Sequence, residues 1–325
     1  MTHSTEKLIN MIENKISSLP LNQEPQTLFE PIQYILSLGG KRIRPLLTLM
    51  ASNLFSDDTE AALNAAIAIE VFHNFTLLHD DLMDKSDMRR GKQTVHKKWN
   101  PNTAILSGDA MLIEAYKYIA KVPVDVLPEA LNLFTQTSME VCQGQQYDMD
   151  FEERDDVSVE EYIAMIRLKT AVLVGCSLKM GALAANSSKQ DADYLYDFGI
   201  NIGLAFQLKD DLLDVYGETA KFGKKLGGDI LNNKKTFLLI KALELSNKDQ
   251  NEELNKWISL EKFDNDEKIN AVKNIYNELN LKSIAESLMK KYYLAALNSL
   301  SAVSVADNKK TELTNLAESL MYREL

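Results

Sequence analysis

The sequence predicts an all-α protein, and two observations carry this prediction. All seven prolines of the 325-residue chain lie at or before Pro128, so the last 197 residues contain none. Long helices exclude proline from their interiors, whereas a sheet protein of this size would need many more turn residues. The stretch EEYIAMIRLKTAVLVGCSLKMGALAA, residues 160–185, repeats apolar residues at intervals of three and four. This spacing, with few polar positions between, indicates a central helix that is buried on nearly all sides.

The same helical period predicts the other helices in order along the chain. They cover residues 4–17, 26–38, 45–55, 61–83, 103–120, 128–148, 192–216, 235–244, 252–257, 266–280 and 282–300. The polar segment LSNKDQNEE, residues 245–253, interrupts the pattern and is predicted to be a loop.

The composition predicts a globular, cytoplasmic protein, which we expect to be a single domain over residues 1–325. Hydrophobic residues make up 45% of the chain and charged residues 26%, as in soluble proteins. The net charge of −11 argues against a nucleic acid partner, which usually requires a basic face. Two cysteines in a chain of this length are typical of a reducing compartment. No apolar run reaches the roughly 20 residues that span a bilayer, so we expect no transmembrane segment.

Two acidic motifs recur in the chain, DDLMD at residues 80–84 and DDLLD at residues 210–214, each at the end of an apolar helix. The first and last aspartates of each motif are four residues apart and share one helical face. One such motif alone is more often a solvated helix end, but two matching ones favour a function. Carboxylate oxygens suit hard divalent cations such as Mg²⁺. The candidate metal ligands are Asp80, Asp81, Asp84, Asp210, Asp211 and Asp214.

Basic residues gather in four short segments beside these motifs. GGKRIRP covers residues 39–45 and RRGK covers residues 89–92, and paired lysines stand in FGKKLGGD and NNKKT. Arginine offers a bidentate fork to a diphosphate and lysine a point charge. Each segment alone could be a solvated basic loop. Together with the aspartates they predict a pocket that binds diphosphates both through metal ions and directly.

These motifs resemble those of the trans-isoprenyl diphosphate synthases, the polyprenyl synthetase family. The matching segments follow in order over almost the whole chain: GGKRIRP, LLHDDLMDKSDMRRGK, GDAML, GQQYDMDF, RLKTA, AFQLKDDLLDVYG and FGKKLGGDI. The resemblance implies a helical bundle around a central cavity, of the isoprenoid synthase type, usually a homodimer. It also implies three Mg²⁺ ions, which Mn²⁺ can replace, and two substrates, isopentenyl diphosphate and an allylic diphosphate.

The resemblance further assigns roles to individual side chains. The aspartates of both motifs would hold the ions that grip the allylic diphosphate, and its direct cationic partners would be Arg89, Lys169 and Lys224. The isopentenyl diphosphate site would use Lys41, Arg44, His73 and Arg90. Thr170 and Gln207 match positions near the reacting carbons, and Gln145 with Asp148 matches a polar pair in the cavity. Lys234 resembles the lysine that follows GGDI, although the adjacent Lys235 leaves the register open.

The reaction implied is chain elongation. Metal ions and basic residues would neutralise the diphosphate that leaves the allylic carbon, and the double bond of isopentenyl diphosphate would attack the resulting cation. The alternatives of another class are a terpene cyclase and a non-catalytic subunit of a synthase. GGKRIRP and the complete second motif argue against a cyclase, and six retained aspartates argue against a non-catalytic subunit.

Product length depends on the turns of helix that precede the first acidic motif. Phe75 lies five residues before Asp80, about 7.5 Å along the axis, and Phe72 about 12 Å. In the family, an aromatic residue five positions before the motif resembles the floor of short-chain enzymes. Thr76 stands where animal farnesyl enzymes have a second aromatic residue. We expect geranylgeranyl diphosphate (C20), with the C15 farnesyl product as the alternative and longer products less favoured. The alternative that Phe72 and Phe75 only pack the core stays open.

Overall fold

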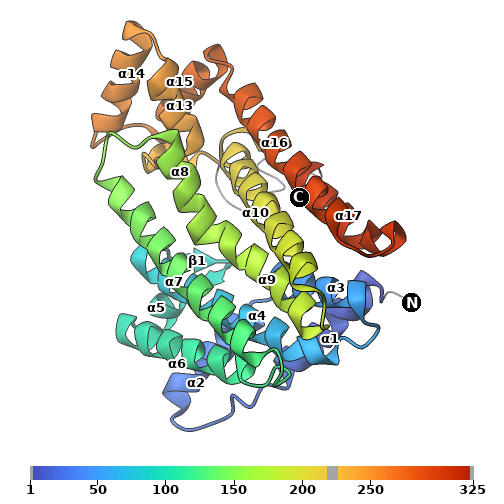
Figure 1. Cartoon of the computed structure of the whole chain (residues 1–325). Helices are drawn as coiled ribbons and strands as arrows, with labels where there is room; N and C mark the ends of the chain where they lie inside the picture. Colours follow the sequence, from blue (N-terminus) through green and yellow to red (C-terminus); the bar gives the residue numbers. More distant parts are fainter. Residues whose placement is uncertain (1–2, 218–225, 323–325) are drawn as a thin grey trace. The chain divides into compact units, whose positions relative to one another are not determined.

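The computed structural model describes residues 3–217 and 226–322, and these are almost entirely helical, as predicted (Figure 1). The helices are α1 Thr5–Ser17, α2 Gln26–Ser37, α3 Ile43–Phe55, α4 Glu60–Met83, α5 Val95–Lys98, α6 Pro101–Ile119, α7 Leu127–Glu152, α8 Val159–Ile166, α9 Val172–Ala184, α10 Lys189–Tyr216, α12 Gly228–Leu231, α13 Phe237–Leu245, α14 Lys248–Ser259, α15 Asn265–Glu278, α16 Leu281–Ala302 and α17 Asp307–Tyr322. Between α8 and α9 lies a π-helical segment, η1 Arg167–Ala171. In the described residues the only strands are β1 Met88–Arg89 and β2 Lys92–Gln93, an antiparallel pair.

The chain forms two compact units, each assembled from three segments of the sequence. Unit 1 comprises residues 1–137, 173–196 and 300–313, and unit 2 comprises residues 138–172, 197–299 and 314–325. The expected single domain over residues 1–325 remains a prediction.

The centre of unit 1 is helix α4, which packs against α3 and α6 (Figure 1). Its residues 65–72, which include several alanines, are all buried, and these small side chains let the neighbouring helices approach closely. Helix α6 begins where the Asn100 side chain accepts from the backbone N–H of Thr103 and Pro101 occupies the first turn. The result is a rigid support for the acidic residues at the C-terminal end of α4.

By length and composition alone, α4 is apolar enough to cross a membrane, and the expected absence of a transmembrane segment stays a prediction. Of its most apolar 18 residues, 72% are buried inside the protein. This burial is the pattern of a core helix, and the first acidic motif follows directly at its end.

The predicted central helix over residues 160–185 is present as three successive segments, α8, η1 and α9. The first two belong to unit 2, and α9 belongs to unit 1 from residue 173 onwards. The whole helix begins with a capping box in which Ser158 and Glu161 bind each other's backbone N–H groups. Its middle widens into η1, a distortion that is frequent at functional sites. Gly144 permits this, because a Cβ there would lie 2.2 Å from the backbone nitrogen of Lys169.

Two predictions about elements were wrong. The segment 245–253 is not a loop throughout, because α14 begins at Lys248 with a capping box between Asn247 and Gln250. Helix α17 was not predicted, although its apolar residues Leu313, Ala317 and Leu320 are buried.

Candidate active site

The first acidic motif lies at the end of α4, where the short hairpin β1–β2 brings Arg89 back to it. The Arg89 Nε donates to Asp81 Oδ2 over 2.7 Å, and its Nη2 lies 4.0 Å from Asp80 Oδ2. Asp84 ends the helix as its C-cap and is exposed. Burial raises the pKa of Asp81, and the Arg89 guanidinium opposes this shift. A guanidinium has five N–H donors, so Arg89 can bind Asp81 and still donate to an anion.

A second group in unit 1 combines Arg44 from α3 with His73 from α4. The Arg44 Nη1 and the His73 Nε2 lie 3.1 Å apart. Burial, together with the charges of Arg44 and Arg90, lowers the pKa of His73 well below its usual value. The imidazole is therefore neutral at physiological pH and can accept from Arg44. Burial also lowers the pKa of Arg44 to about 10, which leaves the guanidinium charged.

Arg90 approaches the Gly-Gly pair that precedes Lys41. A Cβ on Gly40 would lie 2.7 Å from Arg90 Nη2, and Gly40 has a φ of 137°, so only glycine suits this position. Lys41 is exposed. Unit 1 therefore brings together Arg44, His73 and Arg90, and Lys41 precedes Arg44 by three residues.

Sequence reasoning missed the pair that holds this loop, Arg42 and Glu70. The Arg42 Nη1 donates to Glu70 Oε1 over 2.6 Å, its Nε donates to Glu13 over 2.8 Å, and both Arg42 and Glu70 are buried. Asn74 Nδ2 donates to the same Glu70 Oε1 over 2.9 Å. Arg42 has a left-handed φ of 49°, which these bonds stabilise. The available signal was Glu70 itself, the only acidic residue between Glu60 and Asp80.

The second acidic motif lies near the end of α10 in unit 2. Asp211 is buried and accepts a short hydrogen bond from Tyr162 Oη and another, of 3.2 Å, from Gln207 Nε2. Asp214 Oδ2 accepts from the backbone N–H of Asp229 over 3.0 Å. Burial and the nearby charge of Asp229 raise the pKa of Asp211 to about 7. Asp210 is exposed.

Asp229 and Tyr162 were not among the predicted residues. Burial raises the pKa of Asp229 to about 6, and the charges of Asp214 and Asp210 add to this, whereas Lys234 opposes it. Asp229 could have been found from its place in the GGDI segment, residues 227–230. No pattern in the sequence points to Tyr162.

The basic residues of unit 2 meet at Asp148. Lys169 Nζ, from η1, donates to Asp148 Oδ2 over 2.5 Å, and Lys234 Nζ lies 3.8 Å from the same oxygen. Lys235 instead binds Asp155 over 3.0 Å. Lys234 is thus the lysine beside Asp148, and its match to the family's lysine stays a prediction. Lys224 lies outside the described residues.

Polar side chains close to Lys169 complete the predicted set. Thr170 Oγ1 donates to Gln207 Oε1 over 3.2 Å, which links η1 to α10. The buried Gln145 Nε2 has no hydrogen-bond partner in the part of the chain that the structure describes. A buried amide donor without a partner is costly, and a bound ligand would satisfy it.

The residues expected to set product length form an aromatic cluster in unit 1. The rings of Phe72 and Phe75 lie 5.6 Å apart, and Phe72 contacts Phe134 of α7 edge-on at 5.3 Å. Phe75 also contacts His79 at 4.8 Å. Thr76 Oγ1 donates to the backbone oxygen of His73 over 2.8 Å, so its methyl group faces away from that bond.

The acidic residues fit a divalent cation in their chemistry. Among residues 3–217 and 226–322, no three His, Cys, Asp or Glu side chains gather closely enough to enclose a metal ion by themselves. The motifs offer carboxylate oxygens only, which Mg²⁺ prefers, and Mg²⁺ commonly completes its shell with water and substrate phosphate. Burial and neighbouring carboxylates raise the pKa values of Asp211 and Asp229, and the charge of Lys234 offsets this only in part.

Helical units that each carry one DDxxD motif beside basic residues define an isoprenoid synthase. The profile of the family described as polyprenyl synthetase matches residues 25–279. The geranylgeranyl diphosphate synthase of Sulfolobus acidocaldarius is 37% identical over 322 residues, which cover 98% of this chain and 97% of that protein. The geranylgeranyl pyrophosphate synthase of Geoglobus acetivorans is 42% identical over 72% of this chain and 74% of its own length. A crystal structure of a geranylgeranyl pyrophosphate synthase is similar, with a TM-score of 0.94 and 46% identity, over 99% of this chain and 100% of that one.

The chain belongs to the polyprenyl synthetase family, which confirms the resemblance seen in its motifs. It is an enzyme, a trans-prenyltransferase.

Proposed function

We propose that this prenyltransferase condenses isopentenyl diphosphate with an allylic diphosphate (dimethylallyl, geranyl or farnesyl) and releases geranylgeranyl diphosphate. The observation that carries the proposal is the presence of a basic residue near each acidic motif. In unit 1, Arg89 binds Asp81, and in unit 2 the charge of Lys234, which lies with Lys169 at Asp148, also acts on Asp211. A diphosphate with bound divalent ions needs both kinds of group. The names of the relatives above support the C20 product.

Mg²⁺, or Mn²⁺ in its place, would be held by Asp80, Asp81, Asp84, Asp210, Asp211 and Asp214, and three ions are expected from the resemblance. When bound, these ions supply positive charge to the leaving diphosphate. Arg89, Lys169 and Lys234 donate to its oxygens directly and stabilise the charge that develops there. Thr170 and Gln207, linked by their hydrogen bond, provide oxygen atoms that can stabilise the allylic cation.

Isopentenyl diphosphate would bind to the basic group of unit 1. The charged Arg44 and Arg90, with Lys41, supply donors, while the neutral His73 fixes Arg44 through its ring nitrogen. After the new carbon–carbon bond forms, a proton is lost from an adjacent carbon atom of the isopentenyl unit. This proton would go to the diphosphate that has just left, as the resemblance implies.

Product length would be limited by Phe75 and Phe72. Both are buried, and their contacts with His79 and Phe134 hold the rings in place. The smaller Thr76 leaves space that a second aromatic ring would occupy. A C15 product is the alternative, and a longer one is less favoured.

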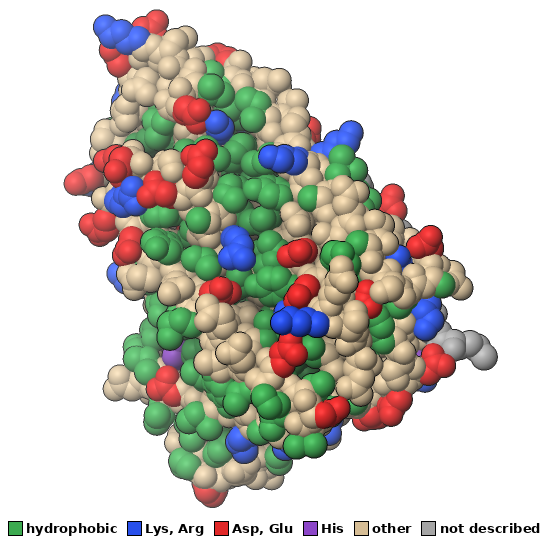
Figure 2. Space-filling view, viewed as in Figure 1, with side chains coloured by type: hydrophobic (Ala, Val, Ile, Leu, Met, Phe, Trp, Pro, Cys, Tyr) green, Lys and Arg blue, Asp and Glu red, His purple; other side chains and the backbone are tan. Residues whose placement is uncertain are grey.

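We further propose a cytoplasmic homodimer that pairs through α6 and the start of α7. Apolar side chains are exposed over this surface (Figure 2): Ile105, Leu106, Ile113 and Leu131 are 46%, 60%, 64% and 42% exposed. Soluble proteins rarely leave so many apolar side chains together in water, and such patches mark interfaces. Sedimentation of the purified chain tests this, because a monomer at micromolar concentration would contradict it.

The deciding experiment for the proposed function is product sizing. The purified chain is incubated with Mg²⁺, labelled isopentenyl diphosphate and each of the three allylic primers in turn, and the products are separated by length. A C20 product is expected from all primers. Turnover of an allylic diphosphate to hydrocarbons without isopentenyl diphosphate would identify a terpene cyclase instead. No turnover with any primer would favour a non-catalytic subunit.

A further inference from the structure

A buried lysine, Lys268 of α15, contacts the loop that carries Lys234. The mechanism proposed above gives this lysine no role. Lys268 is only 1% exposed to solvent. It makes no ion pair with any residue that the structure describes, and burial lowers its pKa. A buried ammonium group without a carboxylate partner is costly, so its three donors must be well satisfied.

The partners of Lys268 come from one loop and one ring. Its Nζ donates to Asn233 Oδ1 over 2.7 Å and to the Leu231 backbone oxygen over 3.4 Å. The ring centroid of Phe263 lies 4.2 Å from Nζ. Two of the three contacts therefore fix the loop that follows α12, and the third holds the ammonium group over an aromatic face.

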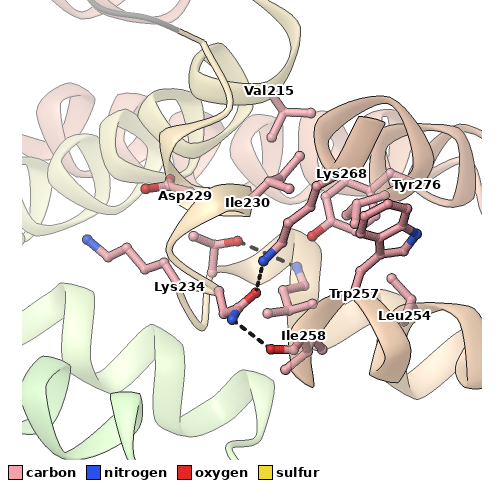
Figure 3. Close-up of a pocket in the computed structure, with 13 residues that line it drawn as sticks. Val215, Asp229, Ile230, Lys234, Leu254, Trp257, Ile258, Lys268 and Tyr276 are labelled. Carbon is pink, nitrogen blue, oxygen red and sulfur yellow. Dashed lines mark hydrogen bonds between the residues drawn. The ribbon is translucent and has the colours of Figure 1, made fainter. Parts of the chain in front are cut away.

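Asn233 continues the link to a second helix. Its Nδ2 donates to the backbone oxygen of Ile258 in α14 over 3.0 Å, and its left-handed φ of 52° turns the chain directly before Lys234 (Figure 3). Asparagine tolerates this conformation better than most residues. The loop is thus tied to α15 through Lys268 and to α14 through Asn233.

The far side of the same loop carries the groups of the candidate active site. In Figure 3, Lys234 extends away from Lys268 on the side where Asp229 lies. The Lys234 backbone N–H donates to the Asp229 backbone oxygen over 2.9 Å, and the Asp229 N–H donates to Asp214 Oδ2 over 3.0 Å. A shift of the loop would therefore move Lys234, Asp229 and the last aspartate of the second motif together.

The space directly between Lys268 and the loop is small. Lys268, Asn233, Lys234, Trp257 and Tyr276 are among the residues around a cavity of about 10 Å³, enough for roughly one water molecule. The ammonium group of Lys268 therefore contacts the loop directly, through Asn233 and the Leu231 carbonyl group.

We propose that Lys268 is a positioning residue. It holds the 231–236 loop on the side opposite the Lys234 side chain, so that Lys234 and Asp229 lie at the allylic diphosphate. This proposal rests on the proposed function of the second acidic motif. Lys268 touches no substrate; it acts through Asn233 and the Leu231 carbonyl group.

The test compares Lys268→Met, which keeps the length of the side chain and removes its donors, with Asn233→Gly, which keeps the positive φ and removes the link. Lys248→Met on the exposed face of α14 is the matched control. Both loop variants should lower kcat/KM for the allylic substrate by about ten- to hundredfold, the cost of a small misplacement of a binding group. The KM for isopentenyl diphosphate should stay within about twofold, since that site is proposed in unit 1. A double variant with Lys234→Ala should lose less than the product of the two single losses, because both changes act partly through Lys234.

Amide hydrogen exchange in the substrate-free protein gives an independent readout. Both variants should speed exchange at the Lys234 and Thr236 amides, while α4 and α10 keep their protection. Equal loss for both substrates, an additive double variant or unchanged exchange in the loop would each overturn the proposal. If Lys268→Met does not fold, Asn233→Gly decides by the same measures. A wild-type protein that is inactive with isopentenyl diphosphate would refute the proposed function, whereas the exchange result would still test the positioning role.

Discussion

The hydrogen bond from Tyr162 to Asp211 leads to a specific prediction for Tyr162→Phe. Asp211 is buried, its pKa is raised to about 7 by that burial, and the Tyr162 hydroxyl opposes the increase. The substitution removes one donor from a buried carboxylate and changes the volume of the site little.

The expected magnitude follows from the strength of the bond. A hydrogen bond to a charged group contributes about 1.5–3 kcal/mol, and 1.36 kcal/mol corresponds to one pKa unit. The pKa of Asp211 in the substrate-free enzyme should therefore rise by about one unit or more. Since the carboxylate must be ionised to bind Mg²⁺, activity at low Mg²⁺ concentration should increase with pH through this pKa, and the variant should need a higher pH.

The ionisation of Asp211 affects stability in the opposite direction: activity should increase with pH, whereas the contribution of Asp211 to stability should decrease. The pKa of Asp211 is higher in the folded protein than the value of about 3.9 in an unfolded chain, so the folded state binds the proton more tightly. This group's contribution to stability is fully present below about pH 4 and is lost as the pH rises towards 7. Added Mg²⁺ should restore stability mainly above pH 7.

The assay is the pH dependence of kcat/KM at subsaturating Mg²⁺, measured from pH 5.5 to 9 for the wild type, Tyr162→Phe and Tyr194→Phe. Tyr194→Phe is the control, because in the described part of the chain the Tyr194 hydroxyl binds only Gln190. The acid limb should move to higher pH in Tyr162→Phe alone, and excess Mg²⁺ should reduce the difference. An unchanged acid limb, with full folding shown by circular dichroism, would refute the reasoning.

Three further predictions follow from the same residues. Activity should vanish in excess chelator and return with Mg²⁺ or Mn²⁺, and Asp210→Asn should lower kcat by roughly two orders of magnitude; full activity in chelator would exclude a metal role. Arg44→Ala should chiefly raise the KM for isopentenyl diphosphate, whereas Lys224→Ala should weaken handling of the allylic substrate; identical kinetic changes in both would disprove two separate sites. Phe75→Ala should shift the products to C25 or longer and Thr76→Phe towards C15, both measured by chromatography; unchanged lengths would place the limit elsewhere.

The sequence alone determined most of the helices, the acidic motifs and the family. Helices depend on contacts between residues three and four apart, so their apolar period is visible without a structure. The aspartates of a DDxxD motif are likewise neighbours along one turn, and their chemistry does not depend on distant residues. Polar composition was a misleading local signal in one segment. Residues 245–253 are mostly polar and were predicted to be a loop, but the capping box at Asn247 begins a helix there.

Only the tertiary structure decided which side chains these motifs contact. Tyr162 and Asp211 are 49 residues apart, Arg42 and Glu70 are 28 apart, and no periodicity links either pair. Lys234 lies near Asp148 whereas Lys235 binds Asp155, and each partner is 80 or more positions earlier in the chain. Such contacts arise when packing buries charged groups, because each buried charge then requires a partner that sequence spacing does not specify.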